Sequence, residues 1–443
     1  MLIRNTLCRA ACALVAVTGA VAGHPASALA AKQPAPAPGQ PLGSLVRTAE
    51  QAELNSIEVP AAWRLSRGQG VTVGVLDTGV GRGVPDLTGS VRYGPDFTRG
   101  INPPGYHPPH LHGTFIASLI AAHGSGPGDS GGVIGVAPAA RVLSVRVLPD
   151  DSEPGFALYN SGAQFDGAVA KGIRYAVRRG VGVINMSLGS AAPTRATQAA
   201  LGYAVSRGVV VVAAAGNNGS RGRRFSPYSY PASYPGVISV AALTPHGARA
   251  SFSEQNASVL VAAPGVGIVG AGPNGSYLRA DGTSPASAFV AGVAALIRSV
   301  DPRLSPALVT QAIITSTRHH PPRGYSPATG FGEVDAVAAL RAAAVLAATR
   351  PVAGLTMAAH FGAGPPGPIQ VVHRDASQIA AYTGVAVGGG LGFVACLVAL
   401  VRLGRRGRRL HTGSAVPPAG GTPGGDGWTP SAGQPGRDWN VTL

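Results

Sequence analysis

Cysteine is nearly absent from this chain of 443 residues, which has only three. Cys8 and Cys12 lie near the N-terminus, and Cys396 lies in an apolar run far along the chain. The long segment between Cys12 and Cys396 therefore has no disulfide, which excludes a small cysteine-stabilised scaffold. We expect the stability of this segment to come mainly from a hydrophobic core.

Acidic and aromatic residues are also few. The chain has 19 Asp and Glu against 35 Lys and Arg, a formal net charge of +16, and aromatic residues make up 5% of it. No basic stretch is interleaved with aromatic residues, so nucleic-acid binding is not predicted. We interpret the basic surplus as solvated surface arginine, with attraction to acidic substrates or an anionic cell surface as the alternative.

Charge is wholly absent from residues 379–401. As a helix this run spans about 35 Å, more than the ~30 Å hydrocarbon core of a bilayer. Five arginines follow within residues 402–409, and basic clusters stay on the cytoplasmic side. We predict a single-pass helix in the cell membrane over residues 379–401, with a cytoplasmic tail over residues 402–443. The glycines in the run lower helix propensity. The alternative interpretation is a buried, alanine-rich helix of a soluble domain.

The N-terminus has the features of a secretory signal. Arg4 and Arg9 give a basic start, an apolar stretch covers residues 10–22, and small residues precede the cleavage point expected after Ala30. We therefore predict a signal peptide over residues 1–30. Together with the membrane helix, it places the intervening domain outside the membrane.

Glycine and proline are concentrated towards the ends of the chain, which leaves one large central core. In this core, apolar runs such as residues 209–215 and 237–242 alternate with helical segments. The alternation predicts an α/β fold of three layers, a largely parallel central sheet with helices on both faces. The predicted domain covers residues 59–347, between an N-terminal extension over residues 31–58 and a linker over residues 348–378.

A candidate nucleophile lies at the start of the predicted helix 285–297, where Gly282-Thr283-Ser284 opens an alanine-rich run. The first N–H groups of a helix have no partner within it and carry partial positive charge. An oxyanion formed beside Ser284 would therefore meet hydrogen-bond donors. On this segment alone, an ordinary serine N-cap is an equally good interpretation.

Two further segments supply the groups that a serine nucleophile needs. Asp77 follows the apolar run 71–76, at the carboxyl end of a predicted core strand, where ligands bind in open α/β sheets. His112 precedes the apolar helical run 115–122. A serine hydroxyl needs a histidine base, and the histidine needs a carboxylate to fix its tautomer and stabilise its charged form.

In the order Asp77, His112, Ser284, these residues resemble the catalytic triad of the subtilisin-like serine proteases, the subtilases. The resemblance covers residues 59–344. The supporting motifs are Gly135-Val136-Ala137-Pro138, Val183 to Gly189, Ala213 to Asn217, Tyr230-Pro231-Ala232, Phe252-Ser253 and Ala263-Pro264-Gly265.

The resemblance implies a serine endopeptidase with a subtilisin-like fold that works through an acyl-enzyme. Ser284 would attack the scissile carbonyl, His112 would transfer the proton, and Asp77 would orient His112. Asn217 falls where the family has a side-chain donor to the oxyanion. Without the resemblance, we would interpret Asn217 as a turn residue in a Gly-Asn-Asn-Gly cluster.

The resemblance also implies a cleft in which peptide or protein substrates bind as an added β-strand. The residues expected to bind substrate are Ser187, Leu188, Gly189, Ala214, Ala215, Gly216 and Ser229, the last near the base of the main specificity pocket. No cofactor is required for this chemistry. Structural calcium is frequent in the family, but no loop of ligand-spaced carboxylates is evident here, so no metal-binding residue is predicted.

Some residues depart from the family pattern, and two other protease patterns are set aside. Leu111 and Ser118 stand where the family commonly has glycine, and residues 285–289 are unusual; these changes bear on specificity and rate rather than on reaction type. The trypsin-like signature in residues 128–132 lies too close to His112 for that fold. An aspartic protease pair is excluded because no apolar strand precedes this segment, which we expect to be a flexible surface loop.

Within the subtilases, the short N-terminal extension and the predicted membrane anchor resemble the mycosins, proteases associated with type VII secretion in actinobacteria. This implies type VII secretion components as partners and secretion substrates as targets. Mycosins commonly carry disulfides, which this chain lacks. The alternative function is a catalytically inactive subtilase-like module that binds peptides or scaffolds a secretion complex.

Overall fold

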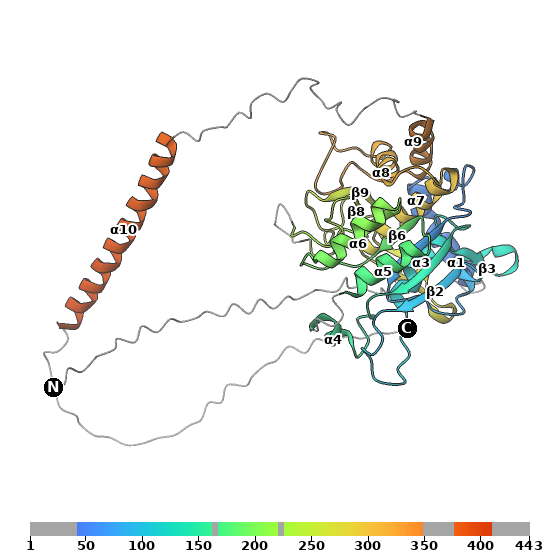
Figure 1. Ribbon diagram of the computed structural model, residues 1–443, viewed down its shortest axis with the longest axis horizontal. Helices are drawn as coiled ribbons and strands as arrows, with labels where there is room; N and C mark the ends of the chain where they lie inside the picture. Colours follow the sequence, from blue (N-terminus) through green and yellow to red (C-terminus); the bar gives the residue numbers. More distant parts are fainter. Residues whose placement is uncertain (1–41, 162–166, 220–225, 349–375, 410–443) are drawn as a thin grey trace, which may run out of the picture. The chain divides into compact units, whose positions relative to one another are not determined.

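The computed structural model describes residues 42–161, 167–219, 226–348 and 376–409 (Figure 1). The chain divides into two compact units, residues 1–350 and 351–442, and each is described by itself. The predicted signal peptide, most of the predicted linker and the tail beyond residue 409 lie outside the described residues.

A seven-stranded sheet forms the centre of the first unit. Neighbouring strands are all parallel, in the order β2-β5-β1-β6-β7-β8-β9, and β3/β4 and β10/β11 form two antiparallel hairpins. The strands are β1 (Thr72–Asp77), β2 (Val91–Asp96), β3 (His123–Ser125), β4 (Gly131–Ile134), β5 (Arg141–Arg146), β6 (Val183–Met186), β7 (Val210–Ala214), β8 (Val237–Leu243), β9 (Val259–Pro264), β10 (Ile268–Ala271) and β11 (Tyr277–Ala280).

Helices of the first unit precede, connect and follow these strands. They are α1 (Leu42–Ser56), α2 (Val59–Ala62), α3 (Leu111–Ala121), α4 (Phe156–Ser161), α5 (Ala168–Arg178), α6 (Arg195–Ser206), α7 (Thr283–Val300), α8 (Pro306–Thr315) and α9 (Ala336–Ala348), with short 3₁₀ turns η1 (Pro85–Leu87), η2 (Pro127–Asp129) and η4 (Pro273–Gly275). Residues 283–297 of α7 are all buried, so this helix runs through the interior of the unit.

The sheet separates two hydrophobic cores, because successive side chains of a strand point to opposite faces. In β7, Val210 and Val212 join the core that contains α3 and α7, whereas Val211 and Ala213 join the core that contains α5 and α6. A strand buried on both faces needs a continuous apolar run, which explains its sequence. The predicted α/β fold, with a parallel sheet between helices, is confirmed.

Helix α1 is part of this unit's core, although the sequence assigns residues 31–58 to an extension. Val46 and Leu54 lie in the same core as α7. Arg47 donates hydrogen bonds to the carbonyls of Gly132 and Gly131 at 2.9 and 2.8 Å. Residues 128–132, which the sequence predicts to be a flexible surface loop, form the tip of the β3/β4 hairpin and the start of β4. Arg47 of α1 holds this tip in place.

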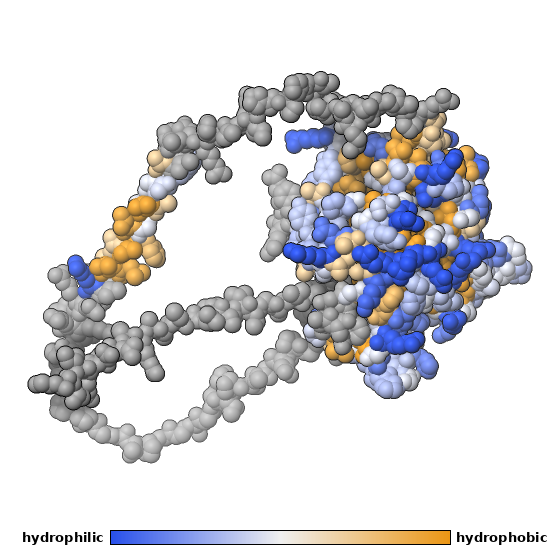
Figure 2. Space-filling view, in the orientation of Figure 1, coloured by the Kyte–Doolittle hydropathy of each residue, from blue (hydrophilic) through white to orange (hydrophobic). Residues whose placement is uncertain are grey.

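The second unit contains one described helix, α10 (Ala376–Arg409). Residues 380–400 are long and apolar enough to cross a membrane, and their side chains are exposed in this unit. Figure 2 shows these apolar side chains along the helix and hydrophilic ones at one end. Helix α7 also has the length and composition of a membrane helix, but it is buried in the first unit.

Candidate active site

The topology of the sheet brings the predicted catalytic residues to one edge. Strand β1 lies between β5 and β6, with β2 and β5 on one side and β6 to β9 on the other, so the strand order reverses there. Ligands of open α/β sheets bind at such a point, outside the carboxyl ends of the strands. Asp77 is the last residue of β1, so its carboxylate lies at this edge.

Asp77 and His112 are in direct contact. The Nδ1 atom of His112 lies 2.7 Å from Oδ1 of Asp77, and the same oxygen accepts the backbone N–H of Thr78 at 2.7 Å. Asp77 is fully buried. A carboxylate in this place keeps the proton on Nδ1 and leaves Nε2 of the imidazole to accept a proton.

Opposing effects set the pKa of His112. Burial lowers it, but the charge and hydrogen bond of Asp77 and the charges of Asp150 and Asp151 raise it, and the net result is a pKa above the ordinary value of 6.5. The site therefore stabilises the imidazolium form. A base that takes up a proton during a reaction needs this property.

Ser284 lies in the first turn of α7, one residue after the helix begins at Thr283. Its backbone N–H is therefore among those without a partner inside the helix. The Oγ atom lies 3.4 Å from the carbonyl oxygen of Ser187, a weak contact that does not prevent it from turning towards His112. Catalytic hydrogen bonds are often incomplete before substrate binds.

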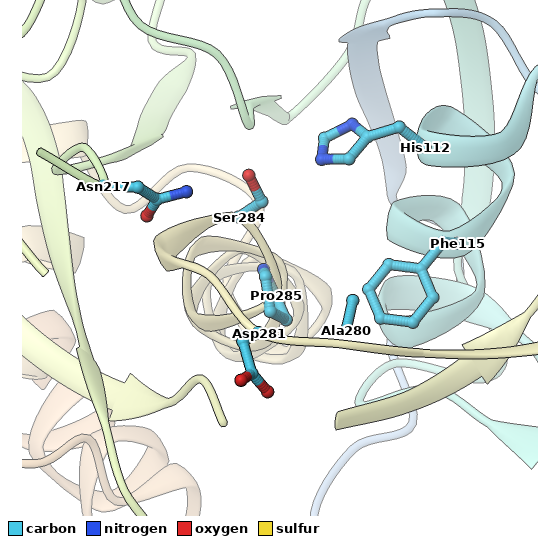
Figure 3. Close-up of a pocket in the computed structure, with 7 residues that line it drawn as sticks. All are labelled: His112, Phe115, Asn217, Ala280, Asp281, Ser284 and Pro285. Carbon is cyan, nitrogen blue, oxygen red and sulfur yellow. The ribbon is translucent and has the colours of Figure 1, made fainter. Parts of the chain in front are cut away.

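Thr283 fixes the orientation of Asn217. The Oδ1 atom of Asn217 accepts the backbone N–H of Thr283 at 2.9 Å and its hydroxyl at 2.8 Å. The Thr283 hydroxyl also accepts the N–H of Gly216 at 3.2 Å. With Oδ1 held in this way, Nδ2 of Asn217 faces Ser284, as Figure 3 shows. The sequence marks Thr283 only as part of the Gly282-Thr283-Ser284 step and gives it no role of its own.

One pocket contains three of the four predicted catalytic residues. Its lining residues are His112, Phe115, Asn217, Ala280, Asp281, Ser284 and Pro285. In Figure 3, His112 and Asn217 lie on opposite sides of Ser284. The structure thus brings together a hydroxyl, a proton acceptor and an amide donor, with Asp77 bonded to the imidazole. This arrangement can carry out acyl transfer.

Apart from Ser229, the residues predicted to bind substrate lie at or directly after the ends of β6 and β7, which are neighbouring parallel strands. Leu188 packs against the core beside α5 and α6, and Ala215 packs in a small core with β8 and β9. Ala214 is also buried. These side chains point into the protein, so the segments can offer a peptide mainly their backbone groups, which is what strand addition requires.

Ser187 and Ser229 have more specific contacts. The Oγ atom of Ser187 lies 3.1 Å from the carbonyl oxygen of Ser284 and 2.9 Å from Oγ of Ser287, so this side chain supports α7. Ser229 lies directly against Gly189, where an added Cβ would come within 2.5 Å of its Oγ. The structure therefore places Ser229 beside one of the two predicted substrate-binding segments.

The residues that depart from the family pattern have local structural roles. The Ser118 hydroxyl donates to the carbonyl of Phe115 at 2.7 Å and accepts the N–H of Ala271 at 2.9 Å, which joins α3 to β10. Phe289 is completely buried, so its bulk fills the core. Pro285 lines the pocket itself and is the unusual residue closest to the chemistry.

Comparison with known proteins relates most of the first unit to the subtilases. The sequence model of the Subtilase family matches residues 68–348. Thermitase from Thermoactinomyces vulgaris is 40% identical over 243 residues, which cover 55% of this chain and 80% of thermitase.

Solved structures with this fold include proteases of type VII secretion systems. The MycP1 structure from Mycobacterium smegmatis is 27% identical, with a TM-score of 0.56, and the match covers 73% of this chain and 89% of that one. The MycP3 protease from the type VII (ESX-3) secretion system is 33% identical, with a TM-score of 0.54, and the match covers 68% and 90% of the two chains.

Proposed function

The chain belongs to the Subtilase family of serine endopeptidases, and from this premise we propose that it is a membrane-anchored, extracytoplasmic endopeptidase with the triad Asp77, His112 and Ser284. The observation that carries the proposal is the 2.7 Å contact between Asp77 and His112, with Ser284 and Asn217 in the pocket that His112 lines. The proposed chemistry needs no cofactor, because every reacting group belongs to the protein, the substrate or water.

The proposed reaction has two halves. The Oγ atom of Ser284 attacks the peptide carbonyl while Nε2 of His112 takes the hydroxyl proton, and His112 then gives this proton to the leaving amine. Water, deprotonated by His112, hydrolyses the acyl-enzyme and releases Ser284. In both halves the oxyanion receives hydrogen bonds from the backbone N–H of Ser284 and from Nδ2 of Asn217.

The anchoring part of the proposal rests on α10. Its apolar residues 380–400 are followed by Arg402 and four more arginines, the order expected of a helix that ends on the cytoplasmic side. The catalytic unit, which precedes α10 in the chain, would then lie outside the membrane. The linker between the two units, rich in glycine and proline over residues 361–368, would let the enzyme act on proteins near the membrane surface.

The partner class is proposed from the structural neighbours. MycP1 and MycP3 are described as proteases of type VII secretion systems, so we propose that this enzyme processes secreted proteins of such a system. The proposed anchor supports the same assignment. The alternative is a non-catalytic module that keeps the peptide-binding segments for a scaffolding role.

A fluorophosphonate probe tests the catalytic proposal, because it forms a covalent bond only with an activated serine. We expect the probe to label the wild-type protein and Ser284→Ala to abolish labelling. Ser130→Ala is the matched control, since exposed Ser130 lies in the trypsin-like signature at the hairpin tip, and it should label like wild type. Equal labelling of wild type and Ser284→Ala would refute the assigned nucleophile. No labelling of wild type, where a control subtilase reacts, would favour the scaffold.

A further inference from the structure

A carboxylate from a distant part of the chain caps the first turn of α3. The Oδ1 atom of Asp150 accepts the N–H of His112 at 3.1 Å, and Oδ2 accepts the N–H of Leu111 at 3.2 Å. His110, at the helix's own N-cap position, makes no side-chain cap bond. Asp150 is only 4% exposed, so little water competes for these two hydrogen bonds.

A buried ion pair holds Asp150 in place. The backbone N–H of Asp150 donates to Oε1 of Glu153 at 2.8 Å, and Arg146 donates to both carboxylate oxygens of Glu153, at 3.0 and 2.7 Å. The side chains of Arg146 and Glu153 are 5% and 0% exposed. A two-pronged pair of this kind fixes direction as well as distance. The segment that presents Asp150 therefore has little freedom to move.

The same arginine also contacts the strand end that carries Asp77. The Nη1 atom of Arg146 donates to the carbonyl of Thr78 at 2.8 Å, and the Thr78 hydroxyl accepts the N–H of Gly113 at 3.0 Å. A closed ring of polar contacts thus joins the end of β1 to the start of α3. Its members are Thr78, Arg146, Glu153, Asp150, His112 and Gly113. This ring fixes the end of β1, which carries Asp77, relative to the start of α3, which carries His112.

We propose that Asp150 is a positioning residue for His112, an inference that rests on the proposed catalytic role of this histidine. Asp150 fixes the backbone of His112 so that the imidazole lies against Asp77. It also supplies a second negative charge beside the ring. Asp150 acts through His112 and not on the substrate.

The charges around the imidazole determine the sign of the electrostatic effect. Asp77 faces His112 from β1, and Asp150 and Asp151 act from the segment after β5. Asp281, between β11 and α7, also lines the pocket, but its side chain points away from His112 in Figure 3 and its Oδ1 accepts the N–H of Gly267 at 2.6 Å. The pocket residues from α7 and from the loop after β7 are uncharged. Removal of the Asp150 charge therefore lowers the pKa of His112. The base must be unprotonated to work, so the acid limb of the kcat/KM profile moves to lower pH.

The test uses full-length protein in detergent and the variants Asp150→Asn and Asp150→Ser. Both lose the charge, but each keeps one hydrogen-bond acceptor for the helix start. Peptide anilides cleaved by the wild type give kcat and KM against pH, fluorophosphonate titration counts active sites, and thermal melting reports folding. We expect kcat per active site to fall about tenfold with KM unchanged. We also expect the acid limb to move down by about half a pH unit or more.

Asp151→Asn is the matched control. Asp151 is the exposed neighbour of Asp150 and acts on His112 by charge, but no hydrogen bond joins its side chain to α3 in the described part of the chain. We expect this variant to keep the wild-type kcat and to show a smaller movement of the acid limb. With this control, a loss of kcat in the Asp150 variants reports the positioning of His112, and the movement of the acid limb reports the loss of negative charge.

Two results would overturn the proposal. The first is a wild-type kcat and acid limb in Asp150→Asn. In the second, both variants melt at a lower temperature and have fewer titratable active sites, but the sites that remain keep the wild-type kcat and pH profile. Asp150 would then stabilise the fold without positioning His112. Failure of the proposed function is distinct, because the wild-type protein itself would then not react with the probe.

Discussion

Glu254 is a carboxyl group buried against the segment that carries Asn217. Its backbone N–H donates to the carbonyl of Gly216 at 2.9 Å, and a Cβ added to Gly216 would lie 2.5 Å from its carboxyl carbon. The residue is 3% exposed, and among the described residues Oε2 has no hydrogen-bond partner. Burial raises the pKa of Glu254 to about 7. The folded protein therefore holds this proton more tightly than the unfolded chain.

Glu254→Gln should stabilise the protein at high pH. Below pH 4.5 both folded and unfolded chains are protonated at Glu254, so the variant and the wild type should unfold alike. Between pH 4.5 and about 7 only the unfolded chain loses the proton, and the wild type loses stability as the pH rises. Above pH 7 we expect the variant to be more stable by about 2 kcal/mol, allowing for partial solvent screening. Thermal melting at pH 4 and pH 8 measures the difference.

Asp151→Asn serves as the control for a carboxylate in an exposed position, and its melting temperature should follow the wild type at both pH values. An equal melting temperature for Glu254→Gln and wild type at pH 8 would contradict the prediction. It would mean that the buried carboxylate is compensated by a donor outside the described residues.

Individual site residues could be predicted where the chain itself marks them. Asp77 ends the buried strand β1, and Ser284 lies in the first turn of the buried helix α7, so local patterns marked both as candidates. The resemblance to the subtilases then gave them their roles. Thr283 and Asp150 were missed because their roles depend on partners 66 and 38 residues away in the sequence. Such contacts arise from the topology of the sheet and leave no local pattern.

At the level of elements, α1 is the clearest difference between sequence and structure. Its place after a proline-rich start indicated an extension, and Leu54 is 2% exposed in the main core. Glu50 also accepts the N–H of Ile134 in β4 at 2.8 Å. Interior strands such as β7 and β8 were predicted correctly because they are wholly or almost wholly apolar. A helix that buries only one stripe on a neighbouring hairpin gives a weaker signal.

Leu54→Ala should therefore destabilise the catalytic unit. Removal of a buried leucine side chain typically costs about 2 to 5 kcal/mol, which corresponds to a fall of several degrees in melting temperature. Leu42→Ala is the control on the same helix, because Leu42 is 46% exposed and should have little effect. If α1 were a dispensable extension, both variants would melt like wild type while fluorophosphonate labelling stayed intact.

On the scale of the whole molecule, we propose that the first unit catalyses the reaction and that the second anchors the protein in the membrane. The first unit contains every proposed reacting group, and in the second unit the apolar residues 380–400 of α10 are exposed within that unit. An exposed apolar surface of this extent is costly in water, so the helix needs a membrane or a partner to cover it. The proposed membrane position follows from that cost and from the arginines that end the helix.

Cys396 allows a direct test of this position, because cleavage of the predicted signal peptide would remove Cys8 and Cys12, the other two cysteines. It lies within residues 380–400, so in intact membranes a charged maleimide should fail to label it, and detergent should make it reactive.

A tag after Leu443 tests the orientation of the helix. The tag should survive external protease on intact cells, whereas the catalytic unit should be digested. Cys396→Ser is the control for the labelling, and a tagged chain that ends before Ala376 should leave the membrane on alkaline extraction. Labelling of Cys396 without detergent would refute a spanning helix, and digestion of the tag would reverse the orientation.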